Sequence, residues 1–209
     1  MGYWGTMSSG PSRRLLWIPI IHTEADLGSM HGIVRQHHVR RAGHKEWQRH
    51  RKTVAQLWVD IQKSIERLEV PADKIRLYQD GLPNCGREAE IVRDLAQAGS
   101  PNYQILLDLM ARGAKLTGTE APELLLEEYE LARQMLVAEE FRPTGEQANR
   151  RQELSQQLLA KRDAYIAERI DKTLQVEETG LLFLGMLHSI ESYLPADIQV
   201  AYLGKGDRK

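Results

Sequence analysis

Four side chains that can bind a metal ion or move a proton stand at the ends of four predicted β-strands. They are His22 after residues 14–21, Asp80 after 74–79, Glu120 after 114–118 and His188 after 181–187. In open α/β sheets, ligands bind outside the carboxyl ends of the parallel strands. We therefore expect two imidazoles and two carboxylates to meet at one edge of one sheet. Such groups bind divalent metals or act as general acids and bases near neutral pH.

Each of these residues also has an ordinary structural interpretation. A histidine at a strand end is often a hydrogen-bonded loop residue, and Asp80-Gly81 has the composition of a turn. Glu120 comes just before Pro122, at a helix start where a carboxylate is favoured by the helix dipole. The coincidence of four such residues at four strand ends favours the functional interpretation.

The predicted strands differ in how far they are buried. Residues 14–21 and 181–187 are apolar runs, typical of strands covered on both faces of a parallel sheet. Pro19 has no N–H to donate, so it predicts an edge position or a local break in pairing. Residues 197–203 alternate between apolar and polar, which predicts one exposed face. Because the link over residues 188–196 is short for a parallel crossover, we expect this last strand to run antiparallel.

Helical segments separate most of the strands. Apolar residues at helical spacing, capping residues and glycine stops mark helices over residues 53–70, 86–99, 100–113, 121–140 and 144–174. Strands that alternate with helices predict an α/β fold. We expect a mostly parallel central sheet of about four to five strands, with helical crossovers on both faces.

A charged pair interrupts the apolar face of the last predicted helix. Leu158 and Ile166 follow i+4 spacing with Arg162 between them, and Asp163 comes next. Charged residues on a face that packs against a sheet need a partner or a function. The rise of the helix and of the following strand places Arg162 at about the level of His188. An arginine at this position could also extend to the rim of the sheet.

The whole chain has 209 residues, a formal net charge of −1 and one cysteine, Cys85. Its length suits one α/β domain, which we place at residues 13–209 after a disordered leader at 1–12. One cysteine excludes an internal disulfide framework and favours a cytoplasmic protein. The apolar run near the N-terminus is too short to span a membrane, and the near-neutral charge does not favour nucleic acid as a partner.

Several motifs resemble those of the TraB/Tiki-type proteins, to which erythromycin esterase and the ChaN-type haem-binding lipoprotein are related in architecture. That family has two Gly-x-x-His motifs at strand ends, an acidic residue after an early strand and an Arg-Asn pair on a helix. Gly185 to His188 matches the second motif, and Pro19 to His22 matches the first except for its proline. Arg162-Asp163 stands in place of Arg-Asn, and Asp80 stands in place of the usual glutamate.

The resemblance implies an α/β protein of a family in which some members hydrolyse peptide or ester bonds. Some of those members use a divalent metal ion, and many have no established activity. The cofactor expected here is therefore a divalent metal such as manganese, zinc or cobalt. The two substitutions shorten one potential ligand by a methylene group and add a negative charge beside Arg162.

We take a hydrolase as the first hypothesis, acting on a peptide, ester or phosphoester bond of a small-molecule or peptide substrate. In it, His22 and His188 bind metal or act as the base. Asp80 and Glu120 bind metal or orient a histidine, and Arg162 stabilises an oxyanion. The alternatives are a non-enzymatic module that binds haem or another small molecule between the histidines, and a scaffold with a vestigial site.

Three other segments have open interpretations. Residues 31–52 hold seven Arg or Lys, five His and one acid. They could form a lid that attracts an anionic substrate, a nucleic-acid patch, or a solvated loop followed by the polar start of a helix. Cys85 precedes a predicted helix and could be a nucleophile, although nothing else marks a thiol enzyme. The helix at 121–140 could provide the face of a homo-oligomer.

Overall fold

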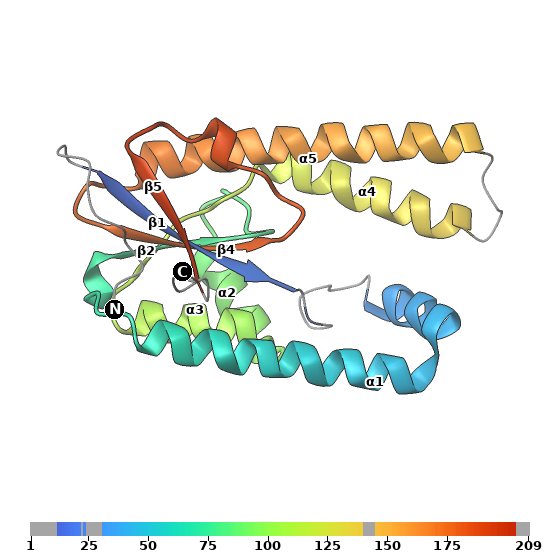
Figure 1. Cartoon of the computed structure of the whole chain (residues 1–209), viewed down its shortest axis with the longest axis horizontal. Coiled ribbons are helices and arrows are strands. Elements are labelled where there is room, and N and C mark those ends of the chain that lie inside the picture. The colour runs from blue at the N-terminus through green and yellow to red at the C-terminus, as the bar shows by residue number, and fades with distance from the viewer. Residues whose placement is uncertain (1–11, 22, 24–30, 140–144, 204–209) are drawn as a thin grey trace, which may run out of the picture.

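The computed structural model describes residues 12–21, 23, 31–139 and 145–203 (Figure 1). At its centre is a five-stranded sheet in the order β3-β2-β4-β1-β5, and all of its strand pairs are parallel. The strands are β1 (Arg13–Ile20), β2 (Ile75–Gln79), β3 (Lys115–Leu116), β4 (Thr179–Gly185) and β5 (Ile198–Tyr202). The predicted α/β class is confirmed.

Helices cover both faces of this sheet (Figure 1). They are α1 (His31–Glu66), α2 (Glu88–Gln97), α3 (Pro101–Ala111), α4 (Pro122–Glu139) and α5 (Gly145–Thr173), with the 3-10 helices η2 (Ala72–Lys74) and η3 (Glu191–Tyr193). Ser100 caps α3 as predicted, because its hydroxyl accepts a hydrogen bond from the Tyr103 N–H. In the part of the chain that the structure describes, no helix is long and apolar enough to cross a membrane.

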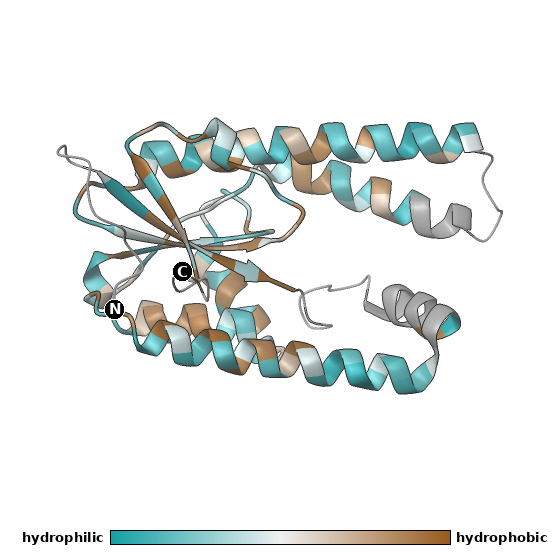
Figure 2. Cartoon of the chain, viewed as in Figure 1, coloured by the Kyte–Doolittle hydropathy of each residue, from teal (hydrophilic) through white to brown (hydrophobic). Residues whose placement is uncertain are grey.

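The alternation of side chains along the strands divides the core into two layers. Leu16 and Ile18 of β1 point to one face, where they pack in a cluster with residues of α1, α2 and α3. Leu15 and Trp17 point to the other face, where they pack with residues of α5. Because both faces of β1 and β4 are covered, their continuous apolar sequences are explained. Figure 2 shows the hydrophilic outer part of α5, which extends beyond the sheet.

The amino-terminal edge of the sheet is held by an ionic cluster around Glu178. This carboxylate accepts hydrogen bonds from Arg76 at 2.6 and 2.9 Å and from Lys115 at 2.9 Å. Its side chain is only 4% exposed. Burial raises the pKa of Glu178, but these hydrogen bonds outweigh burial and lower it to about 2. The cluster ties β2, β3 and the start of β4 together at the edge opposite the candidate site.

Pro19 lies where β1 is paired on one side. β5 runs beside β1 from Arg13 opposite Ile198 to Trp17 opposite Tyr202, so Pro19 comes after the last pair with β5. On the other side, Pro19 pairs in register with Leu184 of β4. A residue without an N–H is tolerated here because the β5 side of β1 is open at this height among the described residues.

The predicted antiparallel last strand is wrong, because β5 runs parallel to β1. The prediction counted the link as residues 188–196, whereas β4 ends at Gly185 and β5 begins at Ile198. A connection over 186–197 reaches the dozen residues that a parallel crossover needs. It contains η3, and Ile190 just before η3 is fully buried against the α5 side of the core.

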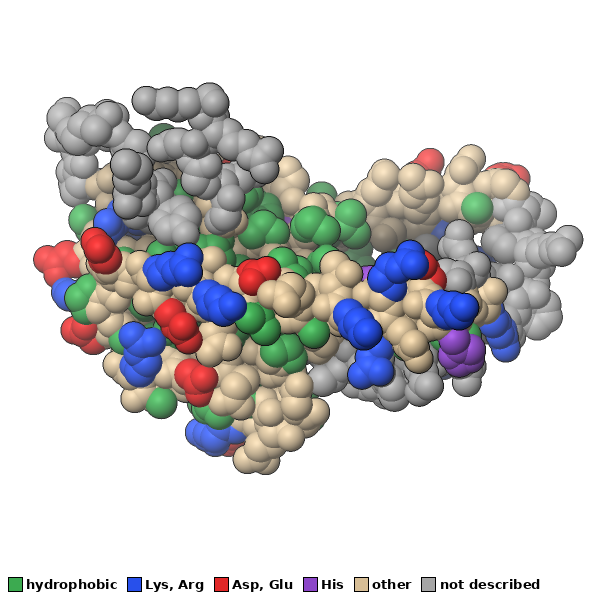
Figure 3. Space-filling model, turned by 60° about the horizontal axis from the view of Figure 1, so that its bottom comes forward, with side chains coloured by type: hydrophobic (Ala, Val, Ile, Leu, Met, Phe, Trp, Pro, Cys, Tyr) green, Lys and Arg blue, Asp and Glu red, His purple; other side chains and the backbone are tan. Residues whose placement is uncertain are grey.

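The basic segment at 31–52 is helical and forms the first part of α1. Gly43 interrupts it with φ of 82°, a left-handed conformation that glycine adopts without strain, so α1 consists of two helices joined at a kink. Five of its basic side chains are exposed: Arg40, Lys45, Arg49, Arg51 and Lys52. Figure 3 shows Lys and Arg side chains gathered over this end of the molecule. The predicted lid role of the segment stays a prediction.

Candidate functional site

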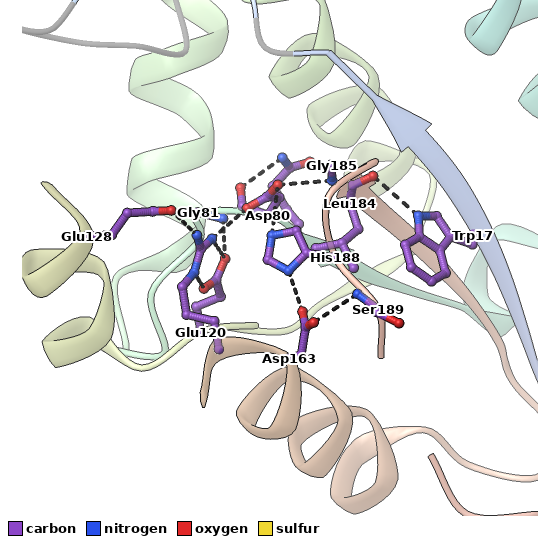
Figure 4. A network of polar contacts seen from close by, with 12 residues as sticks. Trp17, Asp80, Gly81, Glu120, Glu128, Asp163, Leu184, Gly185, His188 and Ser189 are labelled. Atoms are coloured by element: carbon purple, nitrogen blue, oxygen red, sulfur yellow. Dashed lines mark hydrogen bonds and ion pairs between the residues drawn. The ribbon is translucent and has the colours of Figure 1, made fainter. Parts of the chain in front are cut away.

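Three of the four predicted strand-end residues meet at the carboxyl edge of the sheet (Figure 4). Asp80 directly follows β2, Glu120 comes shortly after β3, and His188 follows β4. Arg162 reaches the same point from α5. The fourth predicted residue, His22, lies outside the described residues. The parallel strands explain this gathering, since all of their carboxyl ends lie on one edge.

Asp80 is the residue through which the others are connected. Its side chain is 6% exposed, and its Oδ1 accepts a hydrogen bond from Arg162 at 2.9 Å. Its Oδ2 accepts one from the Gly185 N–H at 3.0 Å, which fixes the carboxylate against the end of β4. A Cβ on Gly185 would lie 3.1 Å from that oxygen, so a side chain here would press on the carboxylate. This contact explains the glycine of the Gly-x-x-His sequence.

Arg162 donates to three carboxylates. Its Nε and Nη2 bind the two oxygens of Glu120 at 2.6 and 2.7 Å, Nη2 also binds Asp80, and Nη1 binds Glu128 of α4. Burial lowers the pKa of Arg162, but the carboxylates more than offset burial, so the net shift is upward and the guanidinium stays charged. Every nitrogen of this group is already directed at a carboxylate. These four hydrogen bonds use four of the five N–H groups, so the second N–H of Nη1 could serve the oxyanion role of Arg162, which stays a prediction.

Glu120 supports the arginine from the buried side. Its side chain is 1% exposed, and besides Arg162 it accepts a hydrogen bond from the Gly81 N–H at 2.7 Å. Burial raises the pKa of Glu120, while the bonds from Arg162 and Gly81 act in the opposite direction. Both oxygens of Glu120 thus accept hydrogen bonds from Arg162 and Gly81 and not from a histidine, so Glu120 orients the arginine, and the predicted metal ligation stays a prediction.

His188 is held between two carboxylates. Its Nδ1 lies 2.5 Å from Asp163 Oδ1, and the other oxygen of Asp163 accepts the Ser189 N–H at 2.8 Å. A carboxylate can only accept, so we assign the imidazole proton to Nδ1. This leaves the lone pair on Nε2, which faces Asp80 Oδ2 at 3.7 Å, beyond hydrogen-bond distance. The His188 side chain is 4% exposed.

The short turn after β4 brings this imidazole back over the sheet. The His188 N–H donates to the Gly185 carbonyl at 3.3 Å, which closes the turn Gly185–His188. Met186 and Leu187 inside the turn are 68% and 84% exposed, so the polar residue is buried while its apolar neighbours face solvent. This inversion of the usual burial pattern is explained by the hydrogen bond between His188 and Asp163, which holds the imidazole in the interior.

A cavity of about 530 Å³ opens above these residues. Its polar lining consists of Asp80, Glu128, Arg162 and His188. Its apolar lining consists of Ile20, Ile21, Leu159, Met186 and Leu187. A concave, mostly apolar space with a few converging polar groups is the usual form of a small-molecule site. The size suits a ligand or substrate segment of a few hundred daltons.

A metal centre is only partly provided by the residues that the structure describes. No group of three or more His, Cys, Asp and Glu side chains within 12–21, 31–139 and 145–203 is arranged to hold a metal ion. His188 Nε2 and Asp80 Oδ2 are close enough to share one ion. Of the other two predicted ligands, Glu120 binds Arg162 and Gly81, and His22 lies outside the described residues.

The sequence predicted a different role for Asp163 and no role for Glu128. Asp163 was treated as an added charge beside Arg162, but it binds His188 instead. Glu128 was not identified, because it follows Glu127 in an acidic and apolar helix, and only the packing of α4 on α5 shows which of the two reaches Arg162. Cys85 is exposed and does not line the cavity.

The comparisons with known proteins add no relative. No family model matches the sequence, and neither the search of curated proteins nor the search of solved structures finds a significant match. Function is therefore inferred from the site itself.

Proposed function

We propose that this protein is a hydrolase in which His188 activates a water molecule for attack on a carbonyl or phosphoryl centre. The observation that carries the proposal is the His188 side chain, buried at the cavity floor with Nδ1 on Asp163 and Nε2 facing Asp80. A histidine oriented by a carboxylate, with its second nitrogen directed at a cavity, is the arrangement of a general base.

The hydrogen bonds define what each residue would do. Asp163 fixes the tautomer and stabilises the imidazolium that forms when Nε2 takes a proton from water. Asp80 lies beside the same nitrogen and would align the water molecule. Arg162 and Glu120 act as positioning residues, because they hold the Asp80 carboxylate at the end of β2.

A divalent metal ion would be an alternative to the general base, because an Nε2 that binds metal has no lone pair left to take a proton from water. Asp80 and His188 would hold it, together with His22, as the resemblance to TraB/Tiki-type proteins implies. When bound, manganese, zinc or cobalt would lower the pKa of a water molecule, so that less basicity is needed from the protein. The carboxylates around Arg162 supply the negative surroundings that favour a cation.

The apolar lining of the cavity supports a second candidate, a module that binds haem or another small molecule without catalysis. Ile20, Ile21, Leu159, Met186 and Leu187 would contact the apolar body of such a ligand, and His188 would bind its polar centre. A visible absorption band that appears on adding haem and is lost in His188→Ala would support this candidate.

The experiment for the hydrolase is a substrate panel of nitrophenyl esters, peptide nitroanilides and phosphoesters. It is run with the wild type, His188→Asn and the matched control His44→Asn, which changes an exposed histidine of α1. Each is measured with a chelator and with added manganese, zinc or cobalt. We expect hydrolysis that His44→Asn retains and His188→Asn loses by at least a hundredfold. Equal activity of the two variants would rule out His188 as the base.

Other properties stay predictions. The cytoplasmic location rests on the single cysteine. Docking of a second copy on α4 rests on its exposed apolar side chains, such as Leu126 at 67% and Tyr129 at 40%. Sedimentation of wild type and Leu126→Lys would test that dimer.

A further inference from the structure

The groups around the cavity carry more negative than positive charge. Asp80, Glu120 and Glu128 surround the guanidinium of Arg162, and a fourth carboxylate, that of Asp163, binds His188. The cluster has a net charge of −3 with neutral His188 and of −2 with protonated His188. If Glu120 holds a proton, the net charge is still −2 or −1. An anionic ligand would therefore be repelled in each of these states, whereas a cation would be attracted.

Glu128 is the acidic group best placed to meet a ligand. It lines the cavity from α4, and its side chain is 47% exposed, whereas those of Asp80 and Glu120 are 6% and 1% exposed. Glu128 and Asp80 bind the two neighbouring terminal nitrogens of Arg162, one from each side of the guanidinium (Figure 4). The charge of Arg162 does not favour an anion here, because three carboxylates bind this guanidinium and outweigh its single positive charge.

An independent observation points to a ligand at the same place. His188 Nε2 faces the cavity, its side chain is more than nine-tenths buried, and this nitrogen makes no hydrogen bond within the described part of the chain. Its nearest polar neighbour there is Asp80 Oδ2 at 3.7 Å, so a water molecule or a ligand group in the cavity can form the hydrogen bond that this nitrogen does not make with Asp80. The reacting group would lie at this nitrogen, and a charged group of the same ligand would lie at Glu128.

We propose that the cavity selects substrates that carry a protonated amine next to an apolar group, and that Glu128 is the residue that determines this specificity. The apolar group would pack on Ile20, Leu159 and Met186, which line the wall. The proposal rests on the proposed hydrolase for the reaction but not for binding. Binding is therefore measured separately from turnover.

The test compares leucinamide with 4-methylpentanamide, which has the same apolar side chain and amide but no amine. Binding is measured by calorimetry at pH 6.5 on the full chain carrying His188→Asn, so that neither compound is consumed. We expect leucinamide to bind at least tenfold more tightly. Glu128→Gln in that background should weaken leucinamide by about five- to tenfold, as expected for a partly exposed charge pair, and leave 4-methylpentanamide unchanged.

Glu127→Gln is the matched control, since Glu127 is the adjacent acid of α4 and does not line this cavity. It should bind both compounds as its parent does. Equal affinity for the two amides, tighter binding of 4-methylpentanoate, or the same loss in both glutamine variants would overturn the inference.

Kinetics separate this inference from the proposed hydrolase. Leucine nitroanilide and 4-methylpentanoyl nitroanilide should differ mainly in KM, and Glu128→Gln should raise KM for the first compound alone. Selective leucinamide binding without hydrolysis of any substrate would uphold the inference and reject the hydrolase. Hydrolysis of both nitroanilides with equal KM would uphold the hydrolase and reject the inference.

Discussion

The change Arg162→Gln removes a buried positive charge from between three carboxylates. In the wild type, the guanidinium makes two hydrogen bonds to Glu120, one to Asp80 and one to Glu128. Glutamine is shorter and neutral, so Glu120 and Asp80 would be left buried without a cation. Breaking a buried ion pair by removing one partner costs about 3–5 kcal/mol. We expect the free energy of unfolding to fall by that amount at pH 7.5.

The same change should make stability depend on pH. Burial already raises the pKa of Glu120 in the wild type, and without the opposing charge of Arg162 this pKa rises further above its value in the unfolded chain. The variant is therefore most stable at low pH, where the carboxyl group is protonated. Its free energy of unfolding falls as the pH rises from the unfolded-state pKa to the folded-state pKa, by up to about 1.4 kcal/mol per pH unit for each such group. Between pH 7.5 and 5.5, the penalty of the variant should shrink by about 2–3 kcal/mol.

Urea unfolding followed by tryptophan fluorescence at both pH values measures this effect. The matched control is Arg133→Gln, because Arg133 is 56% exposed and pairs with Glu130 on the surface of α4. It should cost less than about 0.5 kcal/mol. Adding Glu120→Gln to Arg162→Gln should restore part of the stability at pH 7.5, since one orphaned charge disappears. A penalty for Arg162→Gln below about 1 kcal/mol, or one that is equal at both pH values, would refute the reasoning.

Three further predictions concern other parts of the molecule. Asp163→Asn should lower kcat of the proposed hydrolase by roughly a hundredfold or more with little change in KM, because the amide no longer fixes the His188 tautomer; unchanged kcat would contradict this role. Glu178→Gln should cost about 1–2 kcal/mol at pH 7 after allowance for solvent screening. Because the pKa of Glu178 is lowered to about 2, this cost should fade as the pH drops from about 4.5 toward 2, as acid titration of both proteins would show. Gly118→Ala should cost about 2 kcal/mol, because its Cβ would lie 2.5 Å from Asn84 Cα, and an unchanged melting temperature would exclude that clash.

Much of the fold could be predicted from local sequence. The apolar runs that became β1 and β4 and the capping of α3 at Ser100 are signals that neighbouring residues contain. The direction of β5 could not be predicted in this way, since it depends on whether the connection over residues 186–197 is long enough for a parallel crossover. For residues 31–52, only the polar start of a helix was among the interpretations, and the full length of α1 was not predicted because the charged residues gave no clear apolar period.

The candidate site could also be predicted only in part. That residues such as Asp80 and His188 would meet was predictable, because the carboxyl ends of parallel strands share one edge. Their individual partners were not. Whether Asp163 binds Arg162 or His188 depends on the rotation of α5, and whether Glu127 or Glu128 reaches Arg162 depends on the packing of α4. Both are decided by tertiary contacts that spacing along one helix does not contain.

β4 joins β1 to β2, yet it is made late in synthesis. Arg14 pairs with Thr179, so β1 leaves the ribosome well before β4 and must wait for it before it gains this neighbour. Pairing over such a separation makes folding slow. During the wait, an apolar strand with unpaired edges can associate with other chains. A chain that stops before residue 179 would lack the centre of its sheet, and we expect it to aggregate or be degraded rather than to persist as a partly folded protein.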